Sequence, residues 1–142
     1  MRHRRAEGLH QRERVAAAFG GAVGLAACCD IVLATEKASF CLSEVKLGLI
    51  PAVISPYVVR AIGERQARRY FLSAEVFSAQ EAQHYGLVHL VCEDEQAMHQ
   101  RCDELLLQLA LNGPEAMKAA KELVFAVSHK TITSEVIDDT AQ

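Results

Sequence analysis

The chain has 142 residues, of which 51% are hydrophobic and 23% charged, a balance typical of one globular domain. Its net charge is −3 at pH 7 and it has no tryptophan, which argues against a surface that binds nucleic acid. No uncharged apolar run is long enough to cross a membrane. We therefore expect neither nucleic acid nor a membrane among its partners.

Residues 1–14, MRHRRAEGLHQRER, differ in character from the rest of the chain. They hold five arginines and two glutamates, and no apolar targeting segment follows them. We expect a basic, disordered N-terminal tail here, followed by one folded domain over residues 15–142.

In the first half of the folded part, glycine and proline separate short apolar segments. In chain order we expect a strand over 14–19 ending at Gly20, a small-residue helix over 21–29 buried on all sides, a strand over 31–34, a turn over 35–38, a strand over 39–42 and irregular chain over 43–51.

The second half carries clear helix start and stop signals. Pro56 starts a helix that ends at Gly63, and Ser78 and Glu81 have the spacing of a capping box, with Gly86 at the end of that helix. The remaining expected elements are helices over 63–73, 94–111, 114–127 and part of 133–142, and a strand over 87–91. The class is α/β with a helical C-terminal region, in which the apolar stripe over 98–109 serves as intrachain core.

The five cysteines are odd in number and form no CxxC pair. We interpret them as reduced, small core residues of a cytoplasmic protein, with no metal site. They are Cys28, Cys29, Cys41, Cys92 and Cys102.

Two glycines lead into the helix expected from residue 21, in the run AAAFGGAVGLAACCD. The first N–H groups of a helix have no partner within it and favour negative charge, and glycine lets a ligand oxygen approach them. This arrangement suits an oxyanion hole. The alternative, which composition alone favours, is close packing of a small-residue helix.

Glu44 stands among apolar neighbours in CLSEVKLGLIP. Burial of a carboxyl group among such neighbours makes it a candidate general acid/base. The alternative is an ordinary glutamate on a half-buried loop.

The segment FGGAVGLAACCDIVLATEKASFCLSEVKLGLIP resembles the central signature of the enoyl-CoA hydratase/isomerase (crotonase) family, and FSAQEAQHYGLVHLV is similar to a later segment of it. The resemblance covers the central to C-terminal half of the family domain and implies a partial crotonase-like ββα spiral. It also implies an oxyanion amide at Gly21, a catalytic carboxylate at Glu44 and substrate contacts at Gly20, Gly24, Leu42 and Pro51.

The position of the family's second catalytic glutamate, six residues before Asp30, is Gly24 in this chain. One carboxylate can move a proton between carbons, which is isomerase chemistry, or perform both proton transfers of a hydration in sequence. We expect hydration of a 2-enoyl-CoA, with isomerisation as the alternative. The stretch from Ala52 to Tyr57 resembles bacterial members that act on 3-methylglutaconyl-CoA or isohexenylglutaconyl-CoA in leucine or acyclic-terpene catabolism.

The resemblance further implies an acyl-CoA substrate, no separate cofactor because coenzyme A is part of that substrate, and a homo-oligomer, either a trimer or a hexamer. The first half of the family domain, which supplies the other oxyanion amide, has no counterpart in this sequence. A third hypothesis is therefore a truncated, catalytically silent crotonase fragment.

Overall fold

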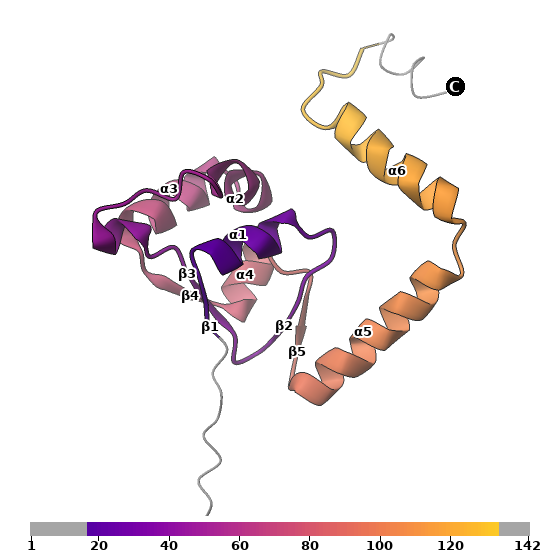
Figure 1. The fold of residues 1–142 in the computed structure, drawn as a ribbon, viewed down its shortest axis with the longest axis horizontal. Coiled ribbons are helices and arrows are strands. Elements are labelled where there is room, and N and C mark those ends of the chain that lie inside the picture. Colours follow the sequence, from indigo (N-terminus) through magenta and orange to yellow (C-terminus); the bar gives the residue numbers. More distant parts are fainter. Residues whose placement is uncertain (1–16, 134–142) are drawn as a thin grey trace, which may run out of the picture. The chain divides into compact units, whose positions relative to one another are not determined.

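The structure is a computed structural model that describes residues 17–133 (Figure 1). Short strands and helices alternate before two longer helices, so the α/β class with a helical C-terminal region is confirmed. In chain order the elements are β1 (Ala17–Phe19), α1 (Gly21–Cys28), β2 (Leu33–Thr35), β3 (Ser39–Cys41), the 3₁₀ helix η1 (Glu44–Leu47), α2 (Ser55–Ile62), α3 (Glu64–Ser73), β4 (Val76–Ser78), α4 (Ala79–Tyr85), β5 (Leu90–Cys92), α5 (Glu95–Ala110) and α6 (Pro114–Val127).

The strands form two small sheets. In the first, β3 lies between β1, with which it is parallel, and β4, with which it is antiparallel. In the second, β2 pairs in parallel with β5. Parallel neighbours need a crossover connection, and α1 supplies the one between β1 and the strands that follow. This crossover brings the start of α1 next to the end of β3, from which the chain continues to Glu44.

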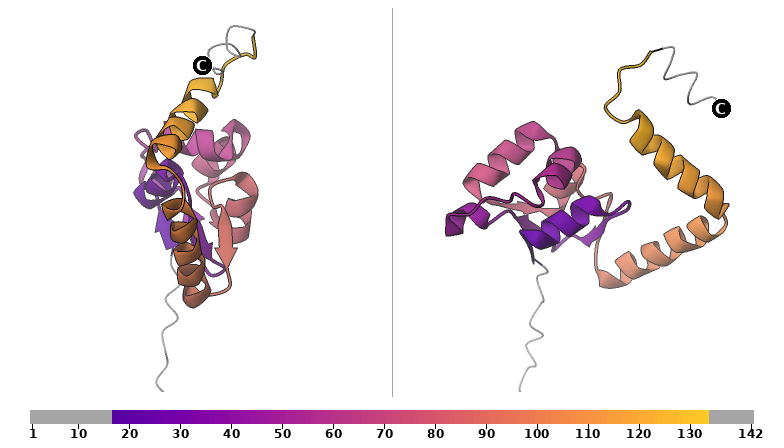
Figure 2. Two further views of the ribbon diagram at one scale, coloured as in Figure 1. Left: turned by 90° about the vertical axis from the view of Figure 1, so that its right-hand side faces the viewer. Right: turned by 45° about the horizontal axis from the view of Figure 1, so that its top comes forward.

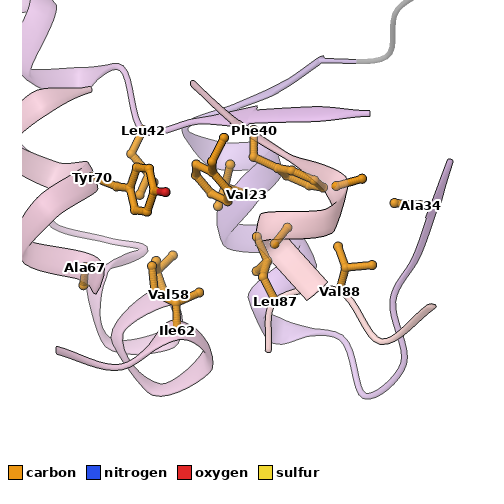
Figure 3. Close-up of a cluster of buried hydrophobic side chains, with 13 residues drawn as sticks. Val23, Ala34, Phe40, Leu42, Val58, Ile62, Ala67, Tyr70, Leu87 and Val88 are labelled. Carbon is orange, nitrogen blue, oxygen red and sulfur yellow. The ribbon is translucent and has the colours of Figure 1, made fainter. Parts of the chain in front are cut away.

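An aromatic cluster forms the centre of the core, and Figure 3 shows part of it. The rings of Phe40 and Phe77 stack with centroids 5.5 Å apart, and Phe77 lies 4.5 Å from the ring of Tyr70. The buried Tyr70 hydroxyl lies 3.1 Å from the Tyr85 hydroxyl, within hydrogen-bonding distance. Burial, together with this hydrogen bond, raises the pKa of Tyr70. The side chain is therefore neutral at physiological pH.

Most of the expected helix boundaries are confirmed, since local chemistry determines them. Pro56 lies in the first turn of α2, and Gly63 follows its last residue. The capping box at Ser78 is present in full, and Gly86 ends α4 with φ of 91°. The strand expected over 87–91 lies slightly later, as β5, and β4 was not predicted from the sequence.

The expectation that the helix after Gly20 is buried on all sides is wrong. Only Val23 and Gly24 of α1 are buried, and Leu25 is 71% exposed. The cysteines at its end are exposed as well, so Cys28 and Cys29 are not core residues, whereas Cys41 is buried. The sequence showed that α1 is apolar, but which of its faces meets α2 depends on the tertiary packing (Figure 2).

The chain divides into two compact units, with the boundary between His99 and Gln100. In the first unit, the side chains of the core cluster come from the segment between Val23 and Val88. In the second, α6 contains no buried residue, and α5, which crosses the boundary, contains none either. The stripe expected over 98–109 is therefore not a buried core in this structure. The predicted tail over 1–14 and most of the helix predicted within 133–142 lie outside the described residues.

Candidate active site

The site is built on the tight turn between β1 and α1. Gly20 is buried with φ of 42°, a backbone conformation that residues with a side chain rarely adopt. Its N–H donates to the carbonyl of Cys41 at 3.0 Å, and its own carbonyl accepts from the N–H of Gly24 at 3.1 Å. These two hydrogen bonds fix the turn to β3 on one side and to the first turn of α1 on the other.

Gly21 is the first residue of α1 and is exposed. Its N–H belongs to the first turn, where a helix offers no carbonyl partner, and no side chain caps this end of α1. A Cβ atom at Gly21 would have no neighbour within 4 Å. The amide is therefore accessible to a ligand and carries the partial positive charge of a helix N-terminus.

Glu44 places its carboxylate against this turn. A Cβ atom on Gly20 would lie 2.6 Å from Oε1 of Glu44, so only a glycine leaves room for the carboxylate there. The backbone of Glu44 is held by the N–H groups of Gly48 and Leu49, both of which donate to its carbonyl. Its other carboxylate oxygen, Oε2, is buried and has no hydrogen-bond partner within residues 17–133. Such oxygens are uncommon in folded proteins and cost free energy.

The next glycine on the same face, Gly24, is covered by an apolar side chain. A Cβ atom on Gly24 would lie 2.8 Å from Cβ of Ile54 and still closer to its Cγ2. Ile54 was not predicted as a site residue. The sequence contained one signal for it, the unusual stretch around it, but nothing in that stretch showed that Ile54 reaches Gly24.

The other two predicted contact residues, Leu42 and Pro51, are both buried. Leu42 is 1% exposed and belongs to the hydrophobic core, and it directly follows Cys41, whose carbonyl accepts the N–H of Gly20. Pro51 lines an apolar pocket of about 290 Å³. The remaining lining residues of this pocket are Val45, Ile50, Ala52, Ser55, Phe71 and Leu72. The structure brings Glu44 to the turn that holds Gly20 and Gly21, and the substrate contacts expected of Leu42 and Pro51 stay predictions.

A profile of the enoyl-CoA hydratase/isomerase family matches residues 15–140. The chain belongs to this family. Among curated relatives, the enoyl-CoA hydratase AKT6-1 of Alternaria alternata is 43% identical over 106 residues, which cover 75% of this chain and 36% of the fungal protein.

Solved structures of this enoyl-CoA hydratase/isomerase family agree in fold. An enoyl-CoA hydratase from Shewanella pealeana is 47% identical with a TM-score of 0.82, and the aligned region covers 89% of this chain and 46% of the Shewanella chain. AtuE from Pseudomonas aeruginosa is 43% identical with a TM-score of 0.81, and the aligned region covers 89% of this chain and 48% of the AtuE chain. The expected crotonase-like fold is confirmed, and the chain spans less than half the length of these relatives.

Two general features are absent among the described residues. Within residues 17–133 there is no group of three His, Cys, Asp or Glu side chains that could hold a metal ion. Among the helices of the same segment, none combines the length and apolarity that a membrane crossing requires.

Proposed function

We propose that this chain carries the acid/base group and one oxyanion-binding amide of a site for acyl-CoA thioesters. The observation that carries the proposal is the contact of the Glu44 carboxylate with Gly20, the residue before the uncapped Gly21 amide. A carboxylate in this place can move a proton on the acyl chain. The amide beside it can hold the negative charge that develops on the thioester oxygen.

The proposed reaction is addition of water to a 2-enoyl-CoA. Glu44 takes a proton from water as the water oxygen bonds to Cβ of the substrate, and the electron pair of the double bond moves toward the thioester carbonyl. The Gly21 N–H donates to the resulting enolate oxygen. The protonated Glu44 then delivers its proton to Cα, which returns the carboxylate to its starting state. One water molecule is consumed, and no cofactor beyond the coenzyme A of the substrate is required.

For the acyl group, we propose a 3-methylglutaconyl-CoA type of substrate of leucine or acyclic-terpene breakdown. The resemblance of the Ala52–Tyr57 stretch to bacterial members with such substrates supports this choice. The apolar pocket adds a place for an acyl chain, because it is lined by Val45, the neighbour of Glu44, and by Pro51. We also propose a reducing, cytoplasmic setting, since two of the five unpaired cysteines, Cys28 and Cys29, are exposed.

One observation favours a second candidate reaction. The position that carries a second glutamate in the family is Gly24 in this chain, and Ile54 occupies the space that a side chain there would fill. An enoyl-CoA isomerase needs only one group, which removes a proton from one carbon and returns it two carbons away. Glu44 could do this with the same amide at Gly21. Reaction in ¹⁸O-labelled water separates the two reactions, because hydration places the label in the product and isomerisation does not.

The test compares Glu44→Gln with the wild-type chain on crotonyl-CoA and 3-methylglutaconyl-CoA. We expect the substitution to lower kcat by about 10²–10⁴-fold, the usual contribution of a positioned acid/base. Glu36→Gln is the matched control, because Glu36 is an exposed glutamate in the turn between β2 and β3. A wild-type chain that neither hydrates nor isomerises these thioesters would overturn the proposal in favour of a catalytically silent chain. A Glu44→Gln variant as active as an active wild type would overturn the role of Glu44.

A further inference from the structure

Glu44 and Ile54 cover two glycines at the start of α1. Gly20 and Gly24 are one helical turn apart and are joined by the hydrogen bond between the Gly24 N–H and the Gly20 carbonyl. Glu44 covers the first of these glycines and Ile54 covers the second. Positions one turn apart on a helix face are separated by about 6 Å. The two side chains therefore cover adjacent positions at the start of α1, although they come from different segments of the chain.

The backbone of Ile54 is fixed at the start of α2. Its carbonyl accepts hydrogen bonds from the N–H groups of Tyr57 and Val58, at 3.1 and 3.0 Å. Val58 is completely buried, and α2 packs against α1. The side chain of Ile54 is therefore projected onto Gly24 from a position that has little freedom to move.

The contact is made by the branch at Cβ. The closest atoms to the Gly24 position are Cγ2 and Cβ of Ile54, whereas Cδ1 is 3.8 Å away. Valine keeps the branch and both contacting atoms and loses only the distant methyl group. Leucine has the same number of carbon atoms as isoleucine but moves the branch to Cγ, so it keeps Cβ and loses the Cγ2 methyl group that lies closest to Gly24.

We infer that Ile54 is a positioning residue for Glu44, an inference that rests on the proposed function. Its β-branch fills the space over Gly24 and closes the side of the site next to the carboxylate. Glu44 is thereby held against Gly20, and its unpartnered Oε2 keeps one orientation toward the substrate.

The experiment compares Ile54→Val and Ile54→Leu in the full chain, with Val53→Leu as the control. Val53 is the adjacent residue and is 86% exposed, so its substitution leaves the packing over Gly24 unchanged. We expect Ile54→Leu to lower kcat toward 3-methylglutaconyl-CoA by about 10²-fold with little change in KM, as for a misplaced catalytic group. Ile54→Val and Val53→Leu keep a kcat close to wild type.

A second measurement does not depend on turnover. The carboxyl ¹³C NMR signal of Glu44, assigned by its disappearance in Glu44→Gln, is recorded at pH 7 for each variant. We expect it to move in Ile54→Leu and to keep its position in Ile54→Val and Val53→Leu. An unchanged signal in Ile54→Leu, or equal changes in all three variants, would overturn the inference. A chain without activity refutes the proposed function, and the NMR comparison still decides whether Ile54 positions Glu44.

Discussion

The helices α1 and α4 begin in opposite ways. At the start of α4, Ser78 Oγ accepts the N–H of Glu81 at 3.2 Å, and the Glu81 carboxylate accepts the N–H of Ser78 at 2.8 Å. At the start of α1, Gly20 has no side chain, and no side chain caps the first-turn amides. One helix satisfies its free amides within the chain, and the other leaves them accessible.

The two helix starts differ more in access to their first-turn amides than in stability. Glycine at the N-cap is only about a few tenths of a kcal/mol less favourable than a capping side chain. The Gly20 and Gly24 face of α1 is covered by Glu44 and Ile54, while Gly21 meets open space. The glycines of the run are therefore explained in two ways. Gly20 and Gly24 allow close packing, and Gly21 leaves a backbone amide accessible.

The largest effect is expected from Gly20→Ala, which tests the packed face. The new methyl group would collide with Oε1 of Glu44 at 2.6 Å, and φ of 42° strains any residue with a side chain. We expect a loss of about 1–3 kcal/mol in the free energy of unfolding from this strain, measured by urea denaturation. We also expect kcat to fall by about 10²-fold, because the carboxylate is displaced.

Gly63→Ala is the control for strain alone. Gly63 also has a positive φ, of 80°, but no atom lies within 4 Å of a Cβ placed there. The Gly63→Ala variant should have a lower free energy of unfolding than wild type and an unchanged kcat. If both variants lose activity equally, the contact between Gly20 and Glu44 is not the reason for the glycine.

Gly24→Ala tests the contact with Ile54. The added methyl group overlaps the Ile54 side chain, and such overpacking typically costs about 1–3 kcal/mol. In the double variant Gly24→Ala/Ile54→Ala the clash with Cγ2 of Ile54 is removed and only the contact with Cβ remains, so the two changes should together cost less than their sum. Urea denaturation of the four proteins of the cycle measures this coupling, and strict additivity would contradict the contact.

Ser78→Ala removes the cap of α4 and should lower the free energy of unfolding by about 1 kcal/mol. The N–H of Glu81 loses its acceptor, as the hydrogen bond of 3.2 Å shows. Because α4 contributes no residue to the site, kcat should stay at the wild-type value. A change in kcat that exceeds the change in folded fraction would mean that the two helix starts are not independent.

Gly21→Ala is expected to have the smallest effect on the free energy of unfolding, and it should raise it, whereas the preceding substitutions lower it. Alanine is favoured over glycine in a helix by about 0.5–1 kcal/mol, and the methyl group meets no atom of the chain. We expect higher stability together with weaker binding of an acyl-CoA, because the methyl group occupies the space in front of the amide. Isothermal titration with crotonyl-CoA measures the binding, and unchanged affinity would argue against Gly21 as the oxyanion amide.

Features set by neighbouring residues were predictable from the sequence. The capping box at Ser78, the helix start at Pro56 and the helix ends at Gly63 and Gly86 all depend on residues a few positions apart. The candidate roles of Glu44 and the glycine run came from their residue types and from the family signature. Their placement beside each other depended on the crossover between β1 and β3, which no local pattern specifies.

The amino-acid sequence by itself determined where the helices start and stop, the α/β class and the family, because these follow from local backbone chemistry and from a continuous signature. Only the tertiary structure decided that Ile54 covers Gly24, that Leu42 lies in the core and that Cys28 and Cys29 are exposed. The physical reason is that burial depends on which faces of α1 and α2 meet. That choice is made by packing between segments distant in the chain, and it leaves no periodic signal in an apolar run such as α1.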